Sequence, residues 1–144
     1  MPIGWNFLRH WSIYQLNYNF QILHHWWLRK CKFANKHFNI FHLNIASLEK
    51  HIHELRTHLS CSKHNFDVIC ISETRLYEEL PSVNVEIDGY EFIHIPTLTQ
   101  CGGVGMYIKN GIDFSIVKNL TELHKDICES IFIEIKQPTN WINL

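Results

Sequence analysis

Histidine and cysteine side chains gather in one short part of the chain, at a spacing that could hold a zinc ion. His58, Cys61 and His64 are separated by two residues each, and His51 lies about two helical turns before His58. Imidazole nitrogen and thiolate sulfur are the ligands that zinc prefers, so these four residues are a candidate site. Finger-type zinc sites, however, need two paired ligand groups at a defined separation. The spacing favours a solvated, histidine-rich helix face over a zinc site.

A second candidate site consists of one amide and one carboxylate that each follow an apolar run. Asn44 closes the first run, and Glu73 comes directly after the second. If the two runs are parallel strands, both side chains emerge at the carboxyl edge of the sheet, where α/β proteins place their ligands. Glu73 could bind Mg²⁺, which prefers hard oxygen ligands, while the amide could orient a phosphate oxygen or a neighbouring side chain. Spacing alone does not separate this site from ordinary polar strand ends.

The elements that must position this pair are predicted from hydrophobic periodicity. Residues 38–45 and 67–72 are apolar on both alternating faces, which predicts two strands that are covered on both sides. Between them, apolar residues recur at helical spacing, at Leu48, Ile52, Leu55 and Leu59. This stripe predicts a helix that Ser47 caps and that faces the sheet. Strand, helix and strand together predict a right-handed parallel crossover and an α/β fold.

Shorter strands are predicted in the second half of the chain, at residues 89–95, 102–109, 114–117 and 131–135. Asn110 and Gly111 both tolerate positive φ, so this pair predicts a tight hairpin turn between the second and third of these strands. We therefore expect this portion to be antiparallel.

Length and composition exclude several classes of protein. The chain has 144 residues, of which 46% are hydrophobic and 19% charged, as expected for one domain. No apolar run approaches the roughly 20 residues of a membrane span. Five cysteines without a CxxC pair or a signal peptide argue against a disulfide scaffold and against secretion, which leaves the nucleus or the cytoplasm. Thirteen basic and fourteen acidic side chains give no global basic field of a dedicated nucleic-acid binder.

Charge and aromatic content change abruptly near residue 37. The net charge is +5 before Glu49 and −6 from there on, and 10 of the 19 aromatic residues fall within the first 38 positions. Residues 1–36 show no sustained period of 2 or 3.6 and are interpreted as a leader of unknown structure. An organelle transit peptide and a basic aromatic surface for single-stranded nucleic acid are the alternatives. Residues 37–144 are interpreted as the folded domain.

Five blocks in order resemble the endonuclease/exonuclease/phosphatase family, most closely the apurinic-type endonuclease domain of non-LTR (LINE-type) retrotransposons. The blocks are HLNIASL from His42, DVICISETRL from Asp67, DGY from Asp88, GGVGMYIK from Gly102 and ESIFIEI from Glu129. The similarity covers roughly residues 38 to 136, which correspond to the first half of the family's domain. It implies a four-layered α/β sandwich, incomplete in this chain, of two packed β-sheets with helices outside.

The resemblance also implies a Mg²⁺-dependent hydrolysis of DNA phosphodiester bonds. Glu73 would bind Mg²⁺, and Asn44 would help to hold the metal and the phosphate region. Two positions depart from the family pattern, because Ala46 stands where relatives often have a polar residue and Arg75 replaces a frequent aromatic residue. These departures concern contacts to the substrate rather than the fold.

The family's catalytic tyrosine, its Asp-x-Asn pair and its final Ser/Thr-Asp-His lie beyond the part that this chain matches. We therefore expect a truncated endonuclease domain of retrotransposon origin that is inactive alone. Its first sheet would leave an apolar face for the missing half-domain, a second copy, a reverse transcriptase or the leader to cover. The rival interpretation is a non-enzymatic binding or interaction module, with a histidine-rich metal-binding version, and the sequence leaves the enzyme question open.

Overall fold

The computed structural model describes six stretches of the chain, which together form eight strands and two helices. The described residues are 10–16, 27–33, 36–78, 81–97, 100–121 and 128–136. The elements, in chain order, are β1 (His10–Leu16), β2 (Trp27–Phe33), β3 (Lys36–Asn44), α1 (Leu48–Cys61), β4 (Val68–Ser72), β5 (Tyr90–Ile95), β6 (Val104–Lys109), β7 (Phe114–Ile116), α2 (Lys118–Thr121) and β8 (Cys128–Ile135).

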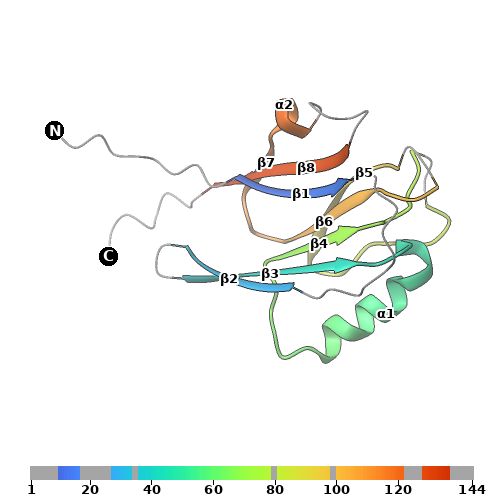
Figure 1. The fold of residues 1–144 in the computed structure, drawn as a ribbon. Helices are drawn as coiled ribbons and strands as arrows, with labels where there is room; N and C mark the ends of the chain where they lie inside the picture. Colours follow the sequence, from blue (N-terminus) through green and yellow to red (C-terminus); the bar gives the residue numbers. More distant parts are fainter. Residues whose placement is uncertain are drawn as a thin grey trace.

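The strands form two sheets that pack face to face. The larger sheet has the order β2-β3-β4-β6-β5, and the smaller has the order β1-β8-β7. β3 and β4 are parallel, and every other described pair is antiparallel. Figure 1 shows the smaller sheet over one face of the larger sheet, α1 across the opposite face and α2 beside the smaller sheet. The predicted mixture of helices and sheets is thus confirmed.

The β3-α1-β4 unit is the parallel crossover that the periodicity predicts. Leu48, Ile52 and Leu55 are buried along one side of α1. They pack against apolar side chains of the larger sheet, including Phe41, Leu43, Ile69, Ile71 and Tyr107. Since alternate residues of a strand face opposite sides, the other residues of these strands face the smaller sheet. The larger sheet is therefore buried on both faces, which explains why its strands are apolar on both sides and why α1 has an apolar stripe.

A second apolar cluster fills the space between the two sheets. It joins Val68, Cys70, Val104, Met106 and Ile108 of the larger sheet to Ile131 and Ile133 of β8. The expectation that this chain builds about one sheet and leaves its inner face open was therefore wrong. The strands β7 and β8 do not extend the first sheet, because β8 pairs with β7 on one side and with β1 on the other, and the resulting sheet packs against the larger one.

The predicted hairpin at Asn110 and Gly111 was also wrong in its pairing. A turn forms there, with the N–H of Ile112 donating to the carbonyl of Lys109 at 3.1 Å, and Gly111 has a φ of 90°. The strands on either side of it, however, belong to different sheets, because β6 pairs with β4 and β5 whereas β7 pairs with β8. The turn carries the chain from one sheet to the other.

Ser47 does not cap α1 in the way that the sequence predicts. Its side chain makes no capping hydrogen bond, and its φ of 132° lies outside the usual N-cap region. The first helical N–H, that of Leu48, instead donates to the carbonyl of Thr74 at 2.9 Å. The loop after β4 thus provides an acceptor for the first of the helix N–H groups that have no partner within the helix.

Two strands lie in the segment that the sequence predicts to be a leader. β1 pairs with β8 in the smaller sheet, and β2 pairs with β3 in the larger sheet. Residues 1–9, 17–26 and 34–35 lie outside the described part of the chain, and so do most of the aromatic residues proposed as a surface for single-stranded nucleic acid. The interpretation of residues 1–36 as a separate leader stays a prediction.

In the part of the chain that the structure describes, neither helix has the length and apolar character needed to span a bilayer.

Acid is expected to destabilise the fold through two half-buried histidines. Burial lowers the pKa of His42 and that of His94 below the ordinary value of 6.5. The unfolded chain therefore binds more protons than the folded chain as the pH falls below about 6.5, and stability present above that value is lost. We expect the urea midpoint, followed by circular dichroism, to fall between about pH 7.5 and pH 5.5. The fall should be smaller in a His42→Gln/His94→Gln double variant, and an equal fall in both proteins would contradict this origin.

Candidate functional site

Asn44 and Glu73 meet at the carboxyl edge of the larger sheet. Asn44 is the last residue of β3, and Glu73 follows Ser72, the last residue of β4. The two strands are parallel and in register, with Asn44 opposite Ser72. The Nδ2 of Asn44 donates to the Oε1 of Glu73 at 2.9 Å. Two residues 29 positions apart in sequence are thus brought into direct contact.

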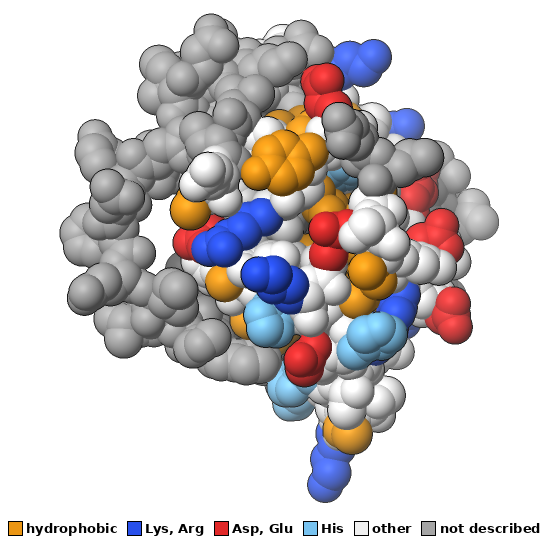
Figure 2. Space-filling model, turned by 90° about the vertical axis from the view of Figure 1, so that its right-hand side faces the viewer, with side chains coloured by type: hydrophobic (Ala, Val, Ile, Leu, Met, Phe, Trp, Pro, Cys, Tyr) orange, Lys and Arg blue, Asp and Glu red, His pale blue; other side chains and the backbone are white. Residues whose placement is uncertain are grey.

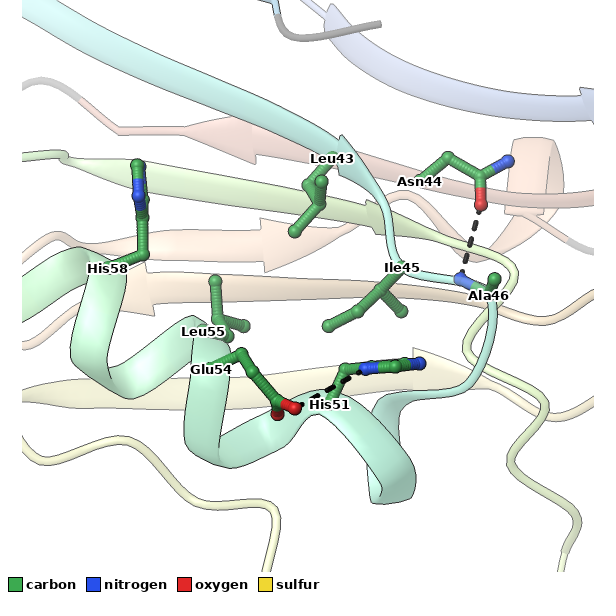
Figure 3. Close-up of a pocket in the computed structure, with 8 residues that line it drawn as sticks. All are labelled: Leu43, Asn44, Ile45, Ala46, His51, Glu54, Leu55 and His58. Carbon is green, nitrogen blue, oxygen red and sulfur yellow. Dashed lines mark hydrogen bonds and ion pairs between the residues drawn. The ribbon is translucent and has the colours of Figure 1, made fainter. Parts of the chain in front are cut away.

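The amide of Asn44 is engaged on both of its polar atoms. Its Oδ1 accepts from the N–H of Ala46 at 3.2 Å, as the dashed line in Figure 3 shows, while its Nδ2 serves Glu73. An asparagine that bonds its own backbone two residues on forms a local turn. In this arrangement Asn44 ends β3 and orients the carboxylate of Glu73.

A guanidinium lies on the other side of the same carboxylate. The Nη2 of Arg75 is 3.6 Å from the Oε2 of Glu73, and the two side chains are 32% and 18% exposed. The Nε of Arg75 is buried and has no hydrogen-bond partner among the described residues. Glu73 therefore stands between an amide and a cation, with part of its surface open to solvent.

The backbone around the pair is unusually strained. Every non-glycine residue with positive φ in the described stretches lies here, namely Ala46 (53°), Ser47 (132°), Glu73 (54°) and Arg75 (54°). Such conformations cost energy and cluster at functional sites when the surrounding structure enforces them. Backbone hydrogen bonds to neighbouring segments hold these conformations in place. The N–H of Ile45 donates to the carbonyl of Ser72 at 3.0 Å, and the N–H of Thr74 donates to the carbonyl of Gly103 at 3.0 Å.

A pocket of about 350 Å³ adjoins the pair between the end of β3 and α1. Its walls are Leu43, Asn44, Ile45, Ala46, His51, Glu54, Leu55 and His58, shown in Figure 3. Most of this lining is apolar, and the Nδ1 of His51 lies 3.8 Å from the Oε1 of Glu54 at its edge. In Figure 3 the amide of Asn44 is turned toward Ala46, away from Leu55 and His58. Asn44 is thus the member of the pair that lines this pocket.

The surface at this end of the molecule carries mixed charges. Figure 2 views the right-hand side of Figure 1, toward which β3 and β4 point, and shows basic, acidic and histidine side chains close together. This mixture agrees with the balanced charge of the sequence. Any anion bound here would be held by a local cation such as Arg75 rather than by a broad positive field.

The four zinc candidates are spread along α1 and the loop after it. His51 and His58 line the apolar pocket, His64 lines a second pocket near the opposite end of α1, and Cys61 is exposed. The ring of His58 also stacks on Phe41 at 5.8 Å. Across the described residues, no three His, Cys, Asp or Glu side chains gather in a way that could hold a metal ion. This applies equally to Glu73, which is the single carboxylate of its pair.

Two contributors to the site were not predicted as site residues. Arg75 was noted as a departure from the family pattern, and its position two residues after Glu73 is the signal that could have identified it. Thr74 is completely buried between Glu73 and Arg75 and holds the first turn of α1 through its carbonyl. The segment Glu73–Arg75 therefore contributes three residues to the site: Glu73 and Arg75 through their side chains, and Thr74 through its backbone carbonyl.

No protein-family model, curated protein or solved structure matches this chain.

Proposed function

We propose that Asn44 and Glu73 form the divalent-metal part of a Mg²⁺-dependent site for DNA phosphodiester hydrolysis, of the endonuclease/exonuclease/phosphatase type. The observation that carries the proposal is the contact of 2.9 Å between these two side chains at the ends of adjacent parallel strands. In sheets of this kind, ligands bind at the carboxyl ends of strands. The resemblance of the five sequence blocks to the endonuclease domain of non-LTR retrotransposons is the second support for the proposal.

The donor set of the pair suits a hard cation such as Mg²⁺ or Mn²⁺ better than Zn²⁺. Glu73 offers carboxylate oxygen and is partly exposed, and no thiolate or imidazole joins it in a metal-binding group within the described residues. Mg²⁺ takes few protein ligands when waters and substrate phosphates complete its shell. Glu73 would hold the ion, which when bound would supply positive charge to a phosphoryl oxygen.

The neighbouring side chains have separate tasks in this proposal. Asn44 holds the carboxylate of Glu73 in one orientation through its Nδ2. Arg75 balances the charge of Glu73 when no cation is bound, and its planar guanidinium can donate to a phosphate oxygen of DNA. Its Nε, which lacks a partner in the described structure, is one donor available for that purpose after a side-chain rearrangement.

In this proposal the polypeptide binds DNA but does not cleave it alone. Hydrolysis needs a positioned base for the attacking water and further charge stabilisation in the transition state. In the described structure, no second carboxylate or histidine completes a metal-binding group with Glu73. We propose that the remaining catalytic groups must come from elsewhere before the site can turn over.

The four-layered sandwich of the family is part of the proposal. Its support is the pair of sheets packed face to face, with α1 covering the outer face of the larger one. The proposed partners are DNA and the polypeptide that supplies the missing catalytic groups, either the second half of such a domain, a second copy or an associated reverse transcriptase.

The proposal predicts Mg²⁺-dependent DNA binding that depends on Glu73. Fluorescence anisotropy with a labelled duplex should show tighter binding by the intact 144-residue chain when Mg²⁺ is present. Loss of a group that only hydrogen-bonds to a metal ligand typically costs ten-fold or more in metal affinity. Glu73→Gln removes the proposed ligand itself, so it should raise the Mg²⁺ concentration needed by at least about ten-fold. Glu91→Gln, which changes an exposed glutamate of β5, is the matched control and should behave like the wild type.

Three other outcomes would contradict parts of this proposal. A DNA affinity that is the same with and without Mg²⁺ and in the Glu73→Gln variant would favour the non-enzymatic binding module. No DNA binding under any condition would remove DNA as the substrate. Supercoiled plasmid incubated with the same protein and Mg²⁺ should stay intact, and Mg²⁺-dependent nicking that Glu73→Gln abolishes would show that the chain is active alone.

A further inference from the structure

A buried carboxylate from the smaller sheet reaches the loop that supports Glu73. Glu129 lies in β8 and is only 3% exposed. One of its carboxylate oxygens, Oε2, accepts from the N–H of Gly103 at 2.6 Å. Gly103 directly precedes β6 of the larger sheet, so this bond connects the two sheets. Burying a carboxylate costs free energy unless hydrogen bonds replace those it made with water. The hydrogen bond from Gly103 is therefore important for keeping Glu129 buried.

The turn that Glu129 contacts has room for glycine alone. At Gly102, where φ is 133°, an added Cβ would lie 2.6 Å from the Oε2 and 2.9 Å from the Oε1 of Glu129. At Gly103, where φ is 81°, it would overlap the Oγ1 of Thr74 and lie 3.3 Å from the backbone nitrogen of Arg75. The glycine pair therefore lies between the carboxylate of Glu129 on one side and the segment after Glu73 on the other.

The same two glycines hold that segment through their carbonyls. The carbonyl of Gly103 accepts from the N–H of Thr74 at 3.0 Å, and the carbonyl of Gly102 accepts from the N–H of Arg75 at 2.9 Å. The carbonyl of Gly102 and the N–H of Gly103 belong to one peptide unit. Glu129 thus binds one end of a peptide whose other end binds Arg75, and hydrogen bonds in such chains strengthen one another.

We propose that Glu129 is a positioning residue for the site. It holds the Gly102–Gly103 peptide, which in turn keeps Glu73 and Arg75 in their positive-φ conformations and aims the carboxylate of Glu73 at Asn44. This inference rests on the proposed function, since it takes Glu73 as the metal ligand. Glu129 itself touches neither metal nor substrate, and it acts through backbone geometry.

Two variants separate the hydrogen-bond acceptor from the charge. Glu129→Gln keeps an oxygen at the position that accepts from Gly103 and removes the charge, whereas Glu129→Asp keeps the charge and withdraws the oxygen by one methylene. Mn²⁺ affinity, measured by water-proton relaxation, reports on Glu73. Amide hydrogen exchange of Thr74 and Arg75, compared with that of Cys70 in central β4, separates local loosening from global unfolding.

We expect Glu129→Asp to weaken Mn²⁺ binding about ten-fold, as is typical for loss of an outer-shell contact, and to accelerate exchange at Thr74 and Arg75 more than at Cys70. Glu129→Gln should stay within about three-fold of the wild type in Mn²⁺ affinity, by the same comparison. Unchanged Mn²⁺ affinity in Glu129→Asp would overturn the inference, and so would an equal loss in both variants. If Glu129→Asp does not fold, the Gln variant still decides, because loss of Mn²⁺ binding there contradicts the role of the acceptor.

Failure of the proposed function would look different. If the wild type binds no Mn²⁺, or binds it equally after Glu73→Gln, the metal site itself is wrong. The exchange data then decide whether Glu129 holds the loop: selective acceleration at Thr74 and Arg75 in Glu129→Asp supports that role, and uniform or unchanged exchange overturns it.

Discussion

Replacement of Gly103 by alanine is expected to lower the free energy of unfolding by about 2–5 kcal/mol. A residue with a Cβ pays about 1–2 kcal/mol to adopt left-handed backbone such as the φ of 81° found here. The added methyl group would also overlap the Oγ1 of Thr74 in a closely packed region, and overpacking of this kind typically costs about 1–3 kcal/mol. The two terms act at the same position and in the same direction.

Gly111→Ala is the matched control for this substitution. Gly111 has a similar φ of 90°, but an added Cβ would meet nothing within 4 Å. We therefore expect the backbone cost alone, about 1–2 kcal/mol. Urea denaturation followed by circular dichroism gives both values. Equal losses in the two variants would show that an added methyl group finds room beside Thr74, which would contradict the close packing of Gly103 against the segment after Glu73.

Replacement of Ile133 by alanine should be comparably damaging, with a loss of about 2–5 kcal/mol. Ile133 lies in β8, is completely buried and packs in the cluster between the two sheets. Truncating such a side chain removes its transfer free energy and leaves a cavity that its neighbours fill only in part. The loss of stability in Ile133→Ala therefore reports on how closely the two sheets pack around this side chain.

The chain offers an isoleucine in the same sheet as a control. Ile116 in β7 is 42% exposed, so Ile116→Ala should cost less than about 1 kcal/mol. Both variants can be compared by urea denaturation under identical conditions. A loss at Ile133 as small as that at Ile116 would mean that the inner face of the larger sheet is not sealed by β8, which is the arrangement that the sequence alone suggested.

The parallel crossover and the pairing of Asn44 with Glu73 could be predicted because they depend on local patterns. Residues 38–45 and 67–72 are apolar on both faces, and the stripe from Leu48 has helical spacing, so strand, helix and strand follow directly from periodicity. Parallel strands then bring their carboxyl ends to one edge, which places the two polar residues together without any long-range information.

The second sheet could not be predicted because it depends on contacts between distant segments. The turn at Asn110 and Gly111 has ideal local chemistry for a hairpin, yet β7 pairs with β8 in the smaller sheet, and Phe114 of β7 packs against the apolar cluster between the sheets. Position 129 shows the same limit, since a glutamate in an apolar strand gives no sign that its carboxylate will be buried against Gly103. Ser47 has the residue type of a helix cap, but its side chain makes no capping hydrogen bond, and the N–H of Leu48 donates to the carbonyl of the distant Thr74.

The most direct test of the Asn44–Glu73 site is a Mn²⁺ titration of ¹⁵N-labelled protein followed by NMR. Paramagnetic broadening should begin at amides around the Asn44–Glu73 pair, namely that of Ala46, which bonds Asn44, and those of Thr74 and Arg75, which follow Glu73. It should disappear in Glu73→Gln, while the Glu91→Gln control behaves like the wild type. Broadening that begins at His51, His58 or His64, or that persists in Glu73→Gln, would contradict the proposed metal site and would favour the histidine-rich alternative.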